Sequence, residues 1–178
     1  MEGVIEVIYV GIFSIGKRPL YAIQLIESLY SKGINIRLSL YGNGKEKENL
    51  QNYIDQNTLN DFIFIKGNQP QEVIKKAYQE SHFVILPSES EGWPKVIAEG
   101  MFWGCLPIAT KVSCVPNMLD NGNRGLLLDL NLEKDTQAMV TILNQPERYR
   151  NKVQQAILWS RKYTLDAFED EIKTLLHS

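Results

Sequence analysis

Apolar residues along the chain follow two alternating patterns, short continuous runs and longer periodic segments. The runs are rich in β-branched residues, which is typical of buried parallel strands. They cover residues 4–10, 36–42, 62–67, 82–88, 106–110 and 125–130. Between the runs the spacing turns helical. The predicted helices cover 19–32, 45–56, 70–81 and 94–103, and the chain after 130 also has a helical pattern. Its last predicted helix carries Leu165, Phe168, Ile172 and Leu175 along one face.

Strands that alternate with helices indicate right-handed βαβ units and a parallel sheet. We therefore expect an α/β fold: a doubly wound, Rossmann-like parallel sheet of about six strands with helices on both faces. One such domain would occupy residues 1–178. Sheets of this type bind ligands beyond the carboxyl ends of their strands, so the segments that follow the strands are the candidate site. These segments are 11–18, 42–45, 67–70, 88–95 and 110–116.

Composition and charge narrow the classes of function. The net charge is −2 and the pI is about 5.8, which argues against nucleic acid or an anionic membrane surface as the main partner. The two cysteines have no CxxC spacing and the chain holds two histidines, so we predict no metal site. The N-terminus lacks the features of a signal peptide, and no apolar run is long enough to span a membrane. We expect a cytoplasmic protein.

The stretch SESEGWPKVIAEG, residues 88–100, contains two carboxylates at the predicted ligand edge. Pro94 suits the first turn of a helix, so the free N–H groups of Lys95, Val96 and Ile97 would form an anion site. Glu99 could accept two hydrogen bonds from a vicinal diol such as a ribose, and Glu91 could reach a second part of the same ligand. Spacing alone favours a plainer interpretation, a surface ion pair between Lys95 and Glu99.

Residues 86–110 favour a ligand-binding role for the two glutamates instead, because they resemble the signature of family 4 glycosyltransferases, also called glycosyl transferases group 1. The hallmark of that family is two glutamates separated by seven residues, which are Glu91 and Glu99 here. The matching positions are Pro87, Ser88, Glu91, Gly92, Trp93, Glu99, Met101, Gly104, Pro107 and Thr110. The resemblance extends from about Val7 to Leu128.

The resemblance implies a role for each part of the site. Glu99 would bind the ribose hydroxyls, and Glu91 would face the donor sugar as the catalytic candidate. Lys17 and the backbone from Gly92 to Val96 would hold the diphosphate. The further candidates for substrate binding are Gly16, Arg18, Gly42, Gly67, Asn68, Trp93 and Lys95. We interpret Met101, Phe102 and Trp103 as core or interface residues rather than ligand contacts.

One position departs from the family pattern. Ile12 stands where the family has an arginine, and Arg18 is the candidate to replace that charge. This departure supports an alternative, a non-catalytic nucleotide-binding or interaction domain of the same fold. A second alternative, a dinucleotide-dependent oxidoreductase, is disfavoured because Lys47 occupies the third position of the G-x-G-x-x-G pattern that begins at Gly42.

The resemblance also implies an architecture larger than this chain. The family's enzymes are retaining, metal-independent and of the two-domain GT-B type, and the matched motifs belong to the C-terminal, donor-binding domain. We therefore expect a hexosyltransferase domain that uses a nucleotide-diphosphate sugar, needs no cofactor and is inactive alone. Its other expected partners are an N-terminal acceptor domain and a glycan or lipid-linked acceptor. A peripheral membrane contact at the inner face would come from the acceptor domain.

Overall fold

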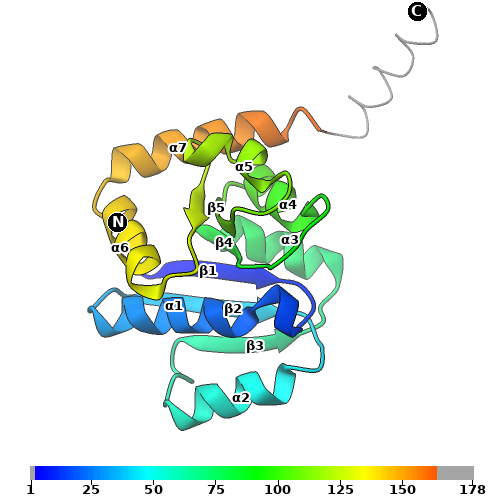
Figure 1. Ribbon diagram of the computed structural model, residues 1–178, viewed down its shortest axis with the longest axis vertical. Helices are drawn as coiled ribbons and strands as arrows, with labels where there is room; N and C mark the ends of the chain where they lie inside the picture. Colours follow the sequence, from blue (N-terminus) through cyan, green and yellow to red (C-terminus); the bar gives the residue numbers. More distant parts are fainter. Residues whose placement is uncertain (1–2, 164–178) are drawn as a thin grey trace, which may run out of the picture.

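Six parallel strands form a single sheet in the computed structural model, which describes residues 3–163 (Figure 1). The strands are β1 (Ile5–Val10), β2 (Ile36–Tyr41), β3 (Ile63–Gly67), β4 (Phe83–Leu86), β5 (Leu106–Thr110) and β6 (Leu126–Leu128). Their order is β3-β2-β1-β4-β5-β6. This is the strand order of a doubly wound Rossmann-type sheet, and it confirms the predicted fold class.

Helices cover both faces of the sheet. The α-helices are α1 (Pro19–Ser31), α2 (Lys47–Gln56), α3 (Gln71–Glu80), α4 (Lys95–Trp103), α5 (Val115–Met118), α6 (Leu132–Leu143) and α7 (Pro146–Ser160). Two short 3-10 helices, η1 (Ile15–Lys17) and η2 (Asp120–Gly122), lie between them. Successive residues of β4 point to opposite faces. Phe83 belongs to the buried cluster that includes residues of α1, α2 and α6, whereas Val84 belongs to the cluster with residues of α3, α4 and α5, and α7 contributes to both.

Most differences from the predicted elements are at their ends. Strand β4 stops at Leu86 rather than at Ser88, because Pro87 has no N–H with which to extend the ladder. Helix α5 and η2 form within 111–124, where the apolar pattern predicted no helix. The helical pattern after 130 is confirmed by α6 and α7. The predicted helix with Leu165, Phe168, Ile172 and Leu175 lies outside the described residues.

Close packing of α4 against β4 sets the position of the candidate site. A Cβ atom at Gly100 would lie 2.5 Å from Cγ1 of Val84, so only glycine lets the helix lie this close to the sheet. Gly104 ends α4 in the left-handed conformation, with φ of 98°. As a result the first turn of α4 and Glu99 are held near the carboxyl edge of β4. No helix within 3–163 is both long and apolar enough to cross a membrane.

Candidate active site

The order in which successive strands join the sheet reverses between β1 and β4, which are neighbours at the centre of the sheet. From β1 the order continues to β2 and β3 on one side, and from β4 to β5 and β6 on the other. In doubly wound folds the segments that follow these two strands border the crevice at the carboxyl edge where ligands bind. Residues 11–18 and 87–94 form its two sides.

Lys17 and Glu91 meet across this crevice. Lys17 ends η1 after β1, and Glu91 lies in the loop between β4 and α4. The Lys17 Nζ donates to Glu91 Oε1 over 2.6 Å. The Glu91 side chain is 10 % exposed and that of Lys17 is 32 % exposed, so this charge pair is partly shielded from water. The structure thus brings together two of the predicted site residues that are 74 positions apart in the chain.

The loop that carries Glu91 is held from both sides. The Glu89 N–H donates to the carbonyl of Gly16 over 2.7 Å, and Arg18 lies 3.8 Å from the Glu89 carboxylate. From the segment after β5, Ser113 Oγ donates to the backbone carbonyl of Glu91. Both basic residues of the β1 loop therefore face acidic residues of the β4 loop.

Tyr9 supports the floor of the crevice. Its ring is fully buried at the end of β1, and its hydroxyl donates to the carbonyl of Ile12 over 3.2 Å. Burial raises the pKa of Tyr9 well above its usual range, and the negative charge of Glu91 raises it further. The phenol therefore stays protonated and remains a hydrogen-bond donor beside the charge pair.

The amino end of α4 points into the same crevice, with one correction to the prediction. Pro94 precedes the helix instead of forming its first turn, because its ψ of 87° is not helical. The Ile97 N–H donates to the Pro94 carbonyl over 3.0 Å and is therefore occupied. The amides of Lys95 and Val96 remain as the candidate anion donors at this helix end.

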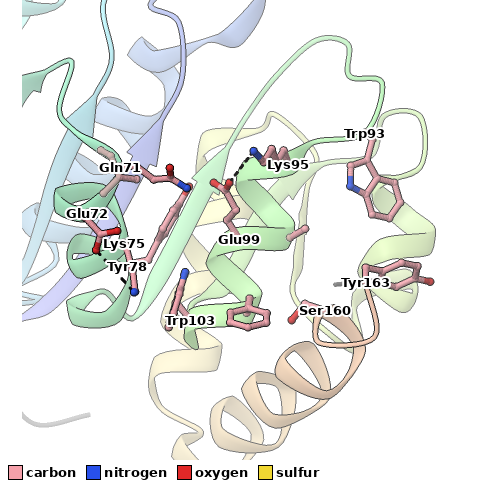
Figure 2. A pocket seen from close by; sticks show the side chains of 13 residues that line it. Gln71, Glu72, Lys75, Tyr78, Trp93, Lys95, Glu99, Trp103, Ser160 and Tyr163 are labelled. Atoms are coloured by element: carbon pink, nitrogen blue, oxygen red, sulfur yellow. Dashed lines mark ion pairs between the residues drawn. The ribbon is translucent and has the colours of Figure 1, made fainter. Parts of the chain in front are cut away.

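Glu99 lines a cavity of about 950 Å³ on the outer side of α4, between α3 and the end of α7 (Figure 2). Its carboxylate lies 3.5 Å from Lys95 Nζ, so the ion pair that the spacing allows does form. The Lys95 side chain is 80 % exposed, and pairs of this kind contribute little stability. Tyr78 of α3 lies on the facing wall, and its phenol is fully buried.

Aromatic side chains make up much of the rest of this cavity. Trp93 is half exposed and packs against the rings of Trp159 and Tyr163, with centroid separations of 6.0 and 5.7 Å. Phe102 and Trp103 also line the cavity, and Trp103 packs against the buried core as well, so their assignment to the core or an interface stays a prediction. Met101 is fully buried, as predicted.

A second cavity, of about 360 Å³, lies at the ends of β1, β2 and β3. Gly42 and Asn68 line it, and it shares Ile74 with the larger cavity. The Gly42 N–H donates to the carbonyl of Gly67 over 3.0 Å, so the backbone of Gly67 holds Gly42 in place at this cavity. A Cβ atom at Gly42 would lie 1.8 Å from the Gly11 carbonyl oxygen, which shows that glycine is required for packing.

The site contains the departure from the family pattern at Ile12 and one residue, Tyr78, that the motifs did not identify. Ile12 is 64 % exposed at the crevice and places an apolar side chain where the family pattern has a cation. Tyr78 was not among the predicted site residues, because its place in an amphipathic helix is that of an ordinary core residue. Across residues 3–163, no three His, Cys, Asp or Glu side chains are grouped so that they could hold a metal ion.

Comparison with known proteins assigns this chain to a family. The profile described as glycosyl transferases group 1 matches residues 2–159. The chain belongs to this family. An uncharacterized glycosyltransferase of Haemophilus influenzae is 28 % identical over 161 residues, which cover 88 % of this chain and 44 % of that protein. WcaL of Salmonella typhimurium, a putative colanic acid biosynthesis glycosyltransferase, is 26 % identical over 143 residues, with coverage of 77 % and 34 %.

Solved structures agree with this assignment at the level of the fold. The Anabaena protein Alr3699/HepE, determined with UDP and glucose, superposes with a TM-score of 0.82 at 16 % identity. The superposition covers 97 % of this chain and 48 % of the Anabaena chain. This group 1 glycosyltransferase domain therefore has the Rossmann-like fold seen in larger relatives, and it spans less than half the length of the curated relatives named above.

Proposed function

We propose that this domain binds the nucleotide-diphosphate sugar donor of a retaining glycosyltransferase. The observation that carries the proposal is the contact between Lys17 and Glu91, which lies where the strand order reverses between β1 and β4. A cation and a carboxylate from different loops meet there beside the amino end of α4, and Glu99 lies on the second turn of that helix. This is a suitable setting for a ligand that carries phosphate, hydroxyl groups and a sugar.

The two cavities support one pose for the donor. The base would occupy the smaller cavity beside Gly42 and Asn68, and the ribose would reach Glu99 past the shared residue Ile74. The diphosphate would lie between Lys17 and the free amides of α4, which would leave the sugar near Glu91. In this pose Arg18, Gly16 and Trp93 border the ligand as secondary contacts.

The chemistry follows from this placement. In glycosyl transfer the bond between the anomeric carbon and the diphosphate oxygen breaks, and that carbon forms a bond to the acceptor hydroxyl oxygen. The acceptor proton is released or passes to the nucleoside diphosphate, on which negative charge builds up as it leaves. Lys17 and the helix amides are positioned to stabilise that charge. Glu91 would hold the sugar and is the candidate catalytic residue. The mechanism we propose uses no metal and no cofactor.

We further propose that the domain works as the C-terminal half of a two-domain enzyme. An N-terminal domain would bind a glycan or lipid-linked acceptor, and the reaction would take place between the two halves. The greater length of the relatives supports this arrangement, and the name of WcaL supports a role in cell-surface polysaccharide biosynthesis. A cytoplasmic location, at the inner face of the membrane, fits that role.

A second candidate function is a nucleotide-binding domain without catalysis. It is favoured by the exposed Ile12 and by the contact of Arg18 with Glu89, which together leave Lys17 as the main cation at the crevice. The two candidates differ in turnover but share the nucleotide site.

Titration calorimetry with UDP, GDP and ADP tests the shared site. At least one nucleoside diphosphate should bind the 178-residue chain, with unchanged affinity in the presence of EDTA. Lys17→Met should weaken binding by about 10- to 100-fold, the scale of a charge-assisted hydrogen bond. Lys32→Met is the matched control, because Lys32 is exposed just after the far end of α1 and should not affect binding. Absence of binding, or binding abolished by EDTA, would refute the proposal.

A further inference from the structure

Tyr78 of α3 carries a buried hydroxyl group beside the larger cavity. The side chain is 1 % exposed, and its Oη is one of the buried side-chain atoms of residues 3–163 that have no hydrogen-bond partner. Nearly all buried polar groups in folded proteins have such a partner, so an exception needs a specific reason. The reason lies in the neighbourhood of this phenol.

Tyr78 faces Glu99 across the groove between α3 and α4 (Figure 2). Burial, together with the charge of Glu99, raises the pKa of Tyr78 far above its usual range, so the phenol keeps its proton as a donor. The two side chains lie close enough to interact, but the Tyr78 Oη has no hydrogen-bond partner of normal geometry. Glu99 instead lies 3.5 Å from Lys95, a contact that water screens.

The two side chains differ in their freedom to move. The Tyr78 carbonyl accepts hydrogen bonds from Cys105 Sγ and from the Ser81 N–H, both over 3.1 Å, and the ring is enclosed by the core. Glu99 has a flexible side chain that is 35 % exposed. A new hydrogen bond between them therefore requires that the carboxylate move toward the phenol.

We infer that Tyr78 is a positioning residue for ribose recognition. When a ribonucleotide binds, Glu99 turns from Lys95 to accept a hydrogen bond from Tyr78 Oη, and the phenol fixes the plane of the carboxylate. A carboxylate has lone pairs for about four hydrogen bonds, so it can accept from Tyr78 and from both ribose hydroxyls at once. This inference rests on the proposed function, in which Glu99 binds the ribose.

The substitution Tyr78→Phe removes the hydroxyl and keeps the ring. The probe is whichever of UDP, GDP and ADP binds the wild-type chain most tightly, compared by calorimetry with its 2′,3′-dideoxy counterpart. The affinity for the ribonucleotide should fall about 3- to 10-fold, as for one lost hydrogen bond. The affinity for the dideoxy nucleotide should change less than about twofold. In a Glu99→Ala background, Tyr78→Phe should have no further effect.

A stability measurement separates positioning from packing. The Tm of Tyr78→Phe should not fall, because the lost hydroxyl had no partner in the folded chain. Tyr149→Phe is the matched control: Tyr149 is largely buried, and its hydroxyl donates to the His82 carbonyl over 3.0 Å. That variant should lower the Tm and leave nucleotide affinity unchanged.

Several results would overturn the inference. Tyr78→Phe could weaken the binding of both nucleotides equally, or could leave the affinity for the ribonucleotide unchanged. It could also still weaken binding in the Glu99→Ala background. Failure of the proposed function has a different signature, since the wild-type chain would then bind none of the three nucleoside diphosphates, and the role of Tyr78 would fall with it.

Discussion

Lys17 and Glu91 form an ion pair at the crevice, so a phosphate that binds there meets a cation that is already partly neutralised. A diphosphate that binds Lys17 competes with the carboxylate that lies 2.6 Å from its ammonium group. Glu91 also repels the incoming anion. The same residue that would hold the sugar therefore opposes binding of a nucleotide that carries no sugar.

Glu91→Gln removes both effects, so it should tighten the binding of a nucleoside diphosphate by roughly 3- to 10-fold, or about 1 kcal/mol. The matching nucleotide sugar should gain less, because it also loses its contact with the carboxylate. Calorimetry on the two ligands measures the difference. Equal changes for both would show that Glu91 does not face the sugar.

The substitution Gly42→Ala tests whether the close contact between the loops after β1 and β2 stabilises the fold. Gly42→Ala should lower the free energy of unfolding by about 2–4 kcal/mol, because the new Cβ atom meets the Gly11 carbonyl oxygen and φ is 143°. Gly16→Ala is the matched control, since its Cβ atom would have no neighbour within 4 Å, and the change should stay within about 0.5 kcal/mol. Urea unfolding compares the two, and similar losses would contradict this account.

At the residue scale, the sequence predicted the edge of the sheet but not the contacts made there. Strand ends and the two-glutamate motif placed Lys17, Glu91 and Glu99 at one edge. The contact between Lys17 and Glu91 joins loops 74 positions apart, and no local pattern encodes its distance. Tyr78 was not predicted, because a sequence pattern can indicate that a tyrosine is buried but not whether its hydroxyl has a hydrogen-bond partner.

At the scale of elements, the strands and long helices followed from periodicity, since each buries one apolar face or run. Helix α5 did not, because its four residues make about one helical turn, which is too short for a repeating pattern of apolar residues to show. The start of α4 shifted by one residue because the ψ of Pro94 depends on the loop before it. The spacing of apolar residues within the helix carries no information about the conformation of that loop.

The opposite edge of the sheet should give the fold a pH dependence. His82 directly precedes β4, and its Nδ1 accepts the N–H of Glu6 over 3.1 Å. Burial lowers the pKa of His82 below its usual value of about 6.5, against a smaller opposite effect of Glu6. The unfolded chain therefore binds this proton more readily, and the stability present above about pH 6.5 is lost as the pH falls below it.

Urea unfolding at pH 7.5 and 5.5 measures that loss. We expect the contribution of His82 to the free energy of unfolding to fall by less than about 1.5 kcal/mol over this range. In His82→Asn the side chain can still accept the Glu6 N–H but does not titrate, so the pH dependence should become flatter. The same slope in both proteins would assign the effect to other groups.

At the scale of the whole molecule, the length of the relatives gives the next prediction. The 178-residue chain alone should transfer no sugar, because a single Rossmann-like domain cannot position an acceptor against the donor. Positioning contributes on the order of 7–11 kcal/mol to such reactions. Product formation by the chain, alone and fused to the acceptor domain of a group 1 relative, is the assay. Comparable turnover by the unfused chain would contradict the two-domain proposal.

A crystal structure with a bound nucleoside diphosphate tests the central claim most directly. We expect the diphosphate between Lys17 and the amino end of α4, the ribose hydroxyls on Glu99, and the contact between Lys17 and Glu91 replaced. A nucleotide bound away from the carboxyl ends of β1 and β4, with the Lys17–Glu91 contact intact, would contradict the account.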